Sequence, residues 1–234
     1  MKQTAHPFPG PQSRGFTLLE LIVVMMVILV LAAFLLPTLQ RAKARGQATA
    51  CINNLRQLGL ATAAYATDAG RFPTILEWLY DRPDAAQGDL TTGKLYSYLK
   101  SKPVYLCPTQ ARKVTKPLYA PVPMEWHPDH SYAINCMMCH AHDATVCVAP
   151  ARTVFFAEEA NLPNDRWGSL AEPFPIQFGT NAPVSAPAFP HGQRGNLLMV
   201  DSHVLRPTQN EMQRVATDRY FWYPTGNDDR SGDL

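Results

Sequence analysis

Hydrophobic residues are concentrated near the beginning of this chain. From Phe16 to Leu36 the sequence reads FTLLELIVVMMVILVLAAFLL, and Glu20 is its one charged residue. As a helix rising ~1.5 Å per residue, this segment would span roughly 32 Å, close to the about 30 Å of a bilayer's hydrocarbon core. We therefore predict a transmembrane helix over residues 16–36, because a buried helix of a soluble protein is rarely so apolar on every side.

After Pro37 the apolar residues follow a helical period. They recur every three or four residues, which predicts that the helix continues over residues 37–70 with one amphipathic face. Pro37 removes one backbone hydrogen bond and introduces a kink, and Gly70 ends the helix. The positions that define the face are Ile52, Leu55, Leu58, Thr62 and Tyr65.

Residues 71–234 are predicted to form a globular head. The 21 prolines and 13 glycines of the chain indicate a loop-rich domain with short elements. We predict short helices at 73–81, 93–100 and 209–216, a strand at 153–157, and a hairpin of 195–200 and 203–205. The predicted fold class is α+β: a long N-terminal transmembrane-plus-amphipathic helix packed on a small, antiparallel-sheet head.

A polar leader, residues 1–15, precedes the apolar segment. A secretory signal peptide has its cleavage site after its apolar part, and no convincing site of that kind follows here. Gly15-Phe16-Thr17-Leu18-Leu19-Glu20 and the apolar run resemble the prepilin peptidase site of type IV pilins and type II secretion pseudopilins, over roughly residues 14–70. The resemblance implies a pilin-like fold, cleavage between Gly15 and Phe16, N-methylation of Phe16, and an assembly role for Glu20.

Glu20 needs a partner, because a carboxylate in the hydrocarbon core costs ~2.5–3.5 kcal/mol on insertion scales. Cleavage would supply the ammonium group of Phe16, four residues away on the same helical face. In the resembled family the usual partner is the terminus of an adjacent subunit, which sets the stagger of the filament. The alternative is a Glu20 that stays hydrated at the membrane interface.

Charge gives a mixed indication of topology. Lys2 and Arg14 lie in the leader, so its removal leaves 19 basic and 19 acidic residues. A mature chain without net charge gives no support for nucleic-acid binding. Arg41, Lys43 and Arg45 follow the span, and basic residues beside a span usually stay in the cytoplasm. Cytoplasmic processing requires the opposite orientation, so we predict a single-pass inner-membrane protein with a cytoplasmic N-terminus and an extracytoplasmic head.

The head resembles one group of pilin-like proteins, common in planctomycetes and related bacteria, that carry a histidine, nine residues, then Asp-Gly. Here His191 is followed by nine residues and Asp201, with Ser202 in place of the glycine. Further landmarks are residues 68–73, 106–108 and 131–135. This group has no established catalytic activity, so the resemblance implies a structural head. His191, Asp201 and His203 also offer ligands for a zinc-like ion, although Asp201-Ser202 is equally ordinary turn chemistry.

Five cysteines give three alternatives. The first is disulfides or free thiols in an extracytoplasmic head. A bond from Cys107 to one of Cys136, Cys139 and Cys147 would connect distant parts of the head and leave Cys51 unpaired, but the connectivity cannot be read from the sequence. The string Cys136-Met-Met-Cys139-His140 has the form of a c-type haem attachment site. Candidates for a second axial ligand are Met124, His127, His130 and His142. The four later thiols also suit structural zinc, with His140 nearby. We expect no cofactor, with haem c or zinc at Cys136, Cys139 and His140 as the alternatives.

These observations leave three functions. The first is a structural pseudopilin-like subunit, processed by a prepilin peptidase and methyltransferase and assembled with other pilin-like subunits into a pilus or secretion pseudopilus. The second is a membrane-tethered monohaem electron carrier. The third is a head that binds a polymer or partner through aromatic side chains such as Trp126, Trp167 and Trp222. We predict no enzyme: the acidic residues Glu158, Glu159 and Asp165 form no recognisable acid–base pair, and we find no nucleophile motif.

Overall fold

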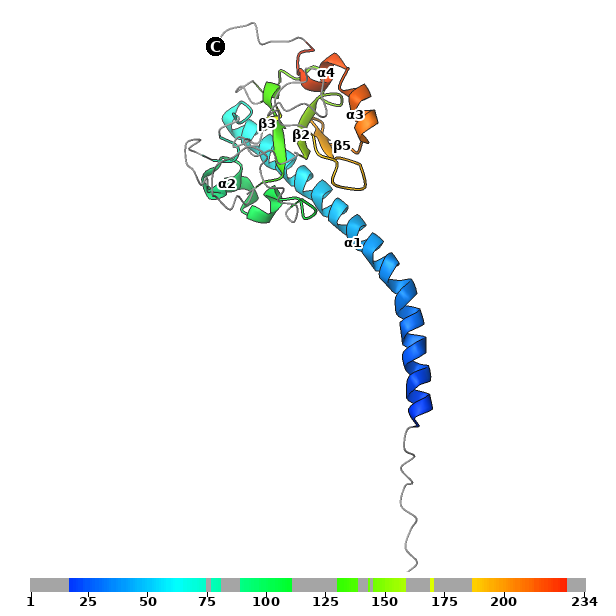
Figure 1. The fold of residues 1–234 in the computed structure, drawn as a ribbon. Helices are drawn as coiled ribbons and strands as arrows, with labels where there is room; N and C mark the ends of the chain where they lie inside the picture. The colour runs from blue at the N-terminus through cyan, green and yellow to red at the C-terminus, as the bar shows by residue number, and fades with distance from the viewer. Residues whose placement is uncertain are drawn as a thin grey trace, which may run out of the picture. The chain divides into compact units, whose positions relative to one another are not determined.

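A computed structural model describes residues 17–74, 77–80, 89–110, 130–138, 143, 145–158, 169–170 and 187–226. The chain divides into two compact units, Met1–Lys43 and Ala44–Leu234. Figure 1 shows the labelled helices and strands.

Helix α1 (Leu18–Ala69) is a single element of 52 residues that belongs to both units. It continues through Pro37, as predicted. The helix ends at Gly70, whose φ of 71° is unfavourable for residues with a Cβ atom. The amide of Gly70 donates to the carbonyl oxygen of Ala66 at 2.9 Å and so satisfies one terminal carbonyl.

The described residues of the second unit form a five-stranded sheet, in the order β3-β1-β2-β4-β5. Its strands are β1 (Tyr132–Asn135), β2 (Val154–Glu158), β3 (Ser169–Leu170), β4 (Leu197–Met199) and β5 (Val204–Leu205). β3 pairs with β1 in parallel, and the remaining pairs are antiparallel. The predicted α+β class, with a long N-terminal helix and a small, mainly antiparallel head, is confirmed.

The C-terminal half of α1 packs on one face of the sheet. Leu55 and Leu58 of the helix share a buried cluster with Phe156 and Leu198 of the strands. Gly59 permits this close packing, because a Cβ atom there would lie 2.6 Å from Cδ2 of Leu198. The predicted amphipathic face therefore rests against β-strand side chains, and their removal from water stabilises the head by about 25 cal/mol per Å² of apolar surface.

The opposite face of the sheet is covered by two short helices, α3 (Gln209–Val215) and α4 (Arg219–Trp222). Met212 and Trp222 pack there in a second buried cluster that includes Ala133 and Leu197. Strand β2 has a register shift between Val154 and Phe156, so the strict alternation of its side chains is interrupted at that point.

The remaining described elements are short. They are the 3₁₀ helices η1 (Leu90–Thr92), η2 (Lys102–Tyr105) and η3 (Cys136–Met138), and helix α2 (Tyr96–Leu99). Helix α2 lies within the predicted segment 93–100, and α3 matches the predicted 209–216. The prediction of a helix over 73–81 is wrong for its described part, where residues 77–79 form a turn.

Candidate functional site

Helix α1 begins with a reciprocal cap between Thr17 and Glu20. The backbone amide of Glu20 donates to Oγ1 of Thr17 at 3.2 Å. In return, Oε2 of Glu20 accepts from the amide of Thr17 at 2.9 Å and from its hydroxyl at 2.8 Å. This is a capping box, which satisfies amides that have no partner within the helix. Gly15 and Phe16, the predicted cleavage and methylation positions, lie outside the described residues.

The side chains that follow this cap are apolar and exposed within their own unit. Large hydrophobic residues from Leu18 to Leu36 have exposed fractions between 43% and 76%. By length and composition, α1 is the one helix in the described part of the chain that can cross a membrane. A soluble protein rarely exposes a continuous apolar surface of this extent, so the segment is built to be covered by lipid or by other protein.

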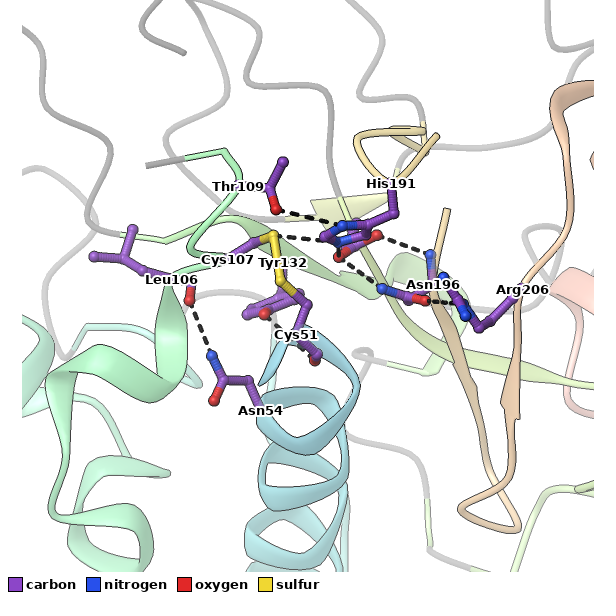
Figure 2. Close-up of polar contacts among 10 residues, drawn as sticks. Cys51, Asn54, Leu106, Cys107, Thr109, Tyr132, His191, Asn196 and Arg206 are labelled. Atoms are coloured by element: carbon purple, nitrogen blue, oxygen red, sulfur yellow. Dashed lines mark hydrogen bonds and ion pairs between the residues drawn. A yellow bond between two sulfur atoms is a disulfide. The ribbon is translucent and has the colours of Figure 1, made fainter. Parts of the chain in front are cut away.

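In the second unit, a disulfide joins Cys51 of α1 to Cys107, 56 residues later. The expectations that Cys51 is unpaired and that Cys107 pairs with Cys136, Cys139 or Cys147 are therefore wrong. The two cysteines meet because α1 packs on the sheet, which brings the buried face of the helix against the loop after η2. Both cysteines are fully buried. Nearby, Nδ2 of Asn54 donates to the carbonyl oxygen of Leu106 at 2.9 Å and fixes the same loop (Figure 2).

Beside the disulfide lies a buried pair, Glu158 and His191. Oε1 of Glu158 is 2.7 Å from Nε2 of His191, and their side chains are 0% and 3% exposed. The same Nε2 atom is 3.5 Å from Sγ of Cys107, and Nδ1 is 3.4 Å from the hydroxyl of Thr109. Figure 2 shows this arrangement between the disulfide and the strands.

Asn196 holds the carboxylate of Glu158 from the other side. Its backbone amide donates to Oε2 at 2.8 Å, and its Nδ2 donates to Oε1 at 2.9 Å. Oδ1 of Asn196 accepts in turn from Nε of Arg206 at 3.1 Å. A buried carboxylate is costly unless its oxygens are hydrogen-bonded, and both oxygens of Glu158 have partners in this network.

The predicted ligand set of His191, Asp201 and His203 is divided in the structure. Asp201 and His203 pair with each other in the hairpin between β4 and β5, with Oδ1 of Asp201 2.5 Å from Nδ1 of His203. The same oxygen accepts from the amide of His203 at 3.1 Å, as expected for turn chemistry. Ser202 has a φ of 74°, a conformation that favours the glycine found there in the resembled group.

The remaining thiols are only partly within the described chain. Cys147 is a free, half-buried thiol. Cys136 opens η3, whereas Cys139, His140, Met124, His127 and His142 lie outside the described residues. His130 is buried and has its ring edge-on to Trp78. Haem attachment and zinc at Cys136, Cys139 and His140 therefore remain predictions.

Two features of the structure were not predicted from the sequence. Thr17-x-x-Glu20 is a sequence signature of a capping box, and this signal was available. The pairing of Glu158 with His191 had no comparable local signal, because the two residues are 33 positions apart. Of the aromatic residues considered for binding, Trp222 is buried in the head, while Trp126 and Trp167 lie outside the described residues.

Comparison with protein families supports the interpretation of the N-terminal segment. Residues 11–36 match the model described as the prokaryotic N-terminal methylation motif. This match contains Gly15, Phe16 and Glu20, and it confirms the prepilin-type resemblance seen in the sequence.

A curated relative extends the similarity. The chain is 32% identical over 72 residues to the type II secretion system core protein G of Pectobacterium carotovorum subsp. carotovorum. The aligned region covers 31% of this chain and 46% of that protein, so it spans about half the relative's length. No solved structure matches the chain. The apolar helix, the methylation motif and this similarity together support a membrane-anchored subunit of the pseudopilin type.

Proposed function

We propose that this protein is a filament subunit of a type II secretion pseudopilus or a related pilus. A prepilin peptidase cuts between Gly15 and Phe16, and the new N-terminus is methylated. The mature subunit is held in the inner membrane by the first part of α1 until it is assembled with other pilin-like subunits. This function is structural, and its partners are the processing enzyme, other subunits and the bilayer.

The observation that carries the proposal is the position of one carboxylate at the start of an exposed apolar helix, inside the matched methylation motif. Both hydrogen bonds from Thr17 fall on Oε2 of Glu20. The cap therefore engages one carboxylate oxygen, and the other can accept from the ammonium group of a processed subunit. An ion pair in a low-dielectric environment is much stronger than one in water, which suits a contact that sets subunit stagger.

The disulfide between Cys51 and Cys107 supports an extracytoplasmic head. Disulfides persist in oxidising compartments and are rare in the cytoplasm. This observation favours the orientation that processing requires over the one suggested by Arg41, Lys43 and Arg45. In the proposed topology the leader is cytoplasmic and the head lies beyond the inner membrane.

Intact-mass spectrometry of the membrane-extracted chain tests the proposal. We expect the loss of residues 1–15 and the addition of one methyl group, about 14 Da, to Phe16 in a strain with an active prepilin peptidase. A Gly15→Leu variant is the matched control and should stay uncut. An uncut wild-type chain in that strain would reject the proposal. The haem-carrier and binding-module alternatives gain no support from the described residues.

A further inference from the structure

Four potential metal ligands from four segments meet in the interior of the head. They are Cys51 of α1, Cys107 after η2, Glu158 at the end of β2 and His191 before β4. One ligand atom from each lies within 4.8 Å of those from the other three. We propose that, in its dithiol form, this cluster binds one zinc-like divalent cation. The proposal is independent of the filament function.

The ligand types select the class of metal. Two thiolates, one imidazole and one carboxylate form a mixed sulfur, nitrogen and oxygen set, which suits tetrahedral Zn²⁺. Calcium and magnesium prefer oxygen ligands alone, and iron–sulfur clusters usually take thiolates. The chemistry of the four side chains therefore favours zinc among the common metals.

The two sulfur atoms are bonded in the structure and must separate after reduction, whereas the other ligand atoms need only small movements. Zinc bonds of about 2.0–2.3 Å place tetrahedral ligands about 3.3–3.8 Å apart. Nε2 of His191 is already 3.5 Å from Sγ of Cys107. The same nitrogen is 2.7 Å from Oε1 of Glu158, so these two atoms would separate slightly to admit the cation.

The surrounding hydrogen bonds orient the ligands. With Nε2 of His191 bound to a metal, the proton of the neutral ring is on Nδ1, which faces the hydroxyl of Thr109 at 3.4 Å. Asn196 donates to both oxygens of Glu158 and accepts from Arg206. Partners of this kind fix the direction and protonation of metal ligands in known sites.

The charge balance is also favourable. Two thiolates and one carboxylate contribute three negative charges against the two positive charges of zinc, and the guanidinium of Arg206 lies one hydrogen-bonded residue away. Binding releases one proton from each of the two thiols. Affinity should therefore rise with pH as the thiols lose their protons.

Oxidation and metal binding exclude each other at this cluster, because a disulfide sulfur carries no thiolate charge. The oxidised chain is held by the bond between Cys51 and Cys107. In the reduced chain the cation would connect the same two segments and also attach β2 and the loop before β4. The cluster then stabilises the head in a chain that has not formed its disulfide.

Cobalt titration of the full chain in mild detergent tests the proposal. The other three cysteines are replaced (Cys136→Ser, Cys139→Ser, Cys147→Ser), the chain is reduced with a phosphine, and Co²⁺ is added alone. We expect one bound Co²⁺ per chain, with a thiolate-to-cobalt charge-transfer band and the visible bands of tetrahedral cobalt. Zn²⁺ should displace the cobalt and abolish both the charge-transfer band and the visible bands.

Variants separate a four-ligand site from simple thiol binding. His191→Gln and Glu158→Gln should each lower cobalt affinity at least about tenfold, and Cys51→Ser should abolish the charge-transfer band. The oxidised chain is the matched control and should bind no cobalt. If the triple-serine chain fails to fold, the wild-type chain gives the same comparison with and without His191→Gln. Equal spectra for the histidine variant and its parent, or no spectrum in the reduced parent, would overturn the proposal.

Discussion

The carboxylate of Glu20 accepts two hydrogen bonds from Thr17 on a single oxygen, Oε2, at 2.9 Å and 2.8 Å. Glu20, the one acidic residue within the apolar part of the matched motif, therefore also belongs to the capping box at the N-terminus of α1. Glu20 can have two separable roles: capping requires a hydrogen-bond acceptor, whereas pairing with an ammonium group requires a negative charge.

Glu20→Gln separates these roles. Glutamine also serves in a capping box, so α1 and its processing should be retained. The lost charge should weaken subunit association at least about tenfold, which corresponds to about 1.4 kcal/mol per contact. Cross-linking of assembled filaments provides the measurement. Thr17→Ser keeps the hydroxyl and is the matched control. Normal assembly of Glu20→Gln would show that capping alone explains this residue.

Gly59→Ala should destabilise the head. The added Cβ atom would lie 2.6 Å from Cδ2 of the fully buried Leu198, and overpacking of this kind costs about 1–3 kcal/mol. Gly46→Ala is the matched control in the same helix, since nothing lies within 4 Å of its added Cβ atom. That change should stabilise by about 0.5–1 kcal/mol. Thermal unfolding of the full chain in detergent distinguishes them, and equal shifts would contradict the packing of α1 on β4.

Ser202→Gly should stabilise the hairpin. Ser202 has a φ of 74°, which is strained for a residue with a side chain. Glycine removes this strain, although it loses more freedom on folding, so the expected net gain is about 0.5–1 kcal/mol. Ser202→Ala retains the strain and should give no gain. The measurement is the unfolding midpoint of each variant relative to the wild type. A lower midpoint for Ser202→Gly would contradict the prediction.

Glu77 should make the head sensitive to acid. Two hydrogen bonds from Arg71, at 2.8 Å and 3.0 Å, lower the pKa of Glu77 from 4.5 to about 2, against the opposing effect of burial. Because the folded pKa is the lower one, the stabilisation is complete above pH 4.5 and is lost as the pH falls from about 4.5 to 2.

Glu77→Gln is the test of this linkage. The variant should lose about 1–2 kcal/mol near neutral pH, a value reduced for the partial exposure of the pair. Its stability should then fall less steeply than that of the wild type below pH 4.5. Unfolding midpoints measured across this pH range provide the comparison. Parallel curves of midpoint against pH for the wild type and the variant would show that Glu77 does not cause the acid sensitivity.

The sequence predicted those features that depend on local pattern. The continuity of α1 through Pro37, its end at Gly70 and the hairpin around Asp201 were all accessible, because periodicity and turn chemistry act over a few residues. Strand β1 was not predicted as a strand. All four of its residues are buried, so it lacks the alternation of a half-exposed strand.

The cluster at Cys51 could not be predicted in the same way. Its four members come from positions 51, 107, 158 and 191, and only the packing of α1 on the sheet brings them together. The His-x₉-Asp pattern suggested one site for His191 and Asp201. In the structure, His191 contacts Glu158 and Cys107, whereas Asp201 shapes the hairpin turn. The spacing of His191 and Asp201 in the sequence therefore does not correspond to a shared site, because the two residues have different neighbours in the structure.

The bond between Cys51 and Cys107 has a mechanical consequence. If a subunit is pulled by its N-terminus, tension that reaches Cys51 passes directly to Cys107 through the two sulfur atoms. The intervening chain, which includes the end of α1 and the helices α2 and η2, is bypassed and carries no load. In single-molecule stretching of the oxidised protein, the extension released on unfolding should therefore lack the contour length of residues 52–106, and reduction should restore it.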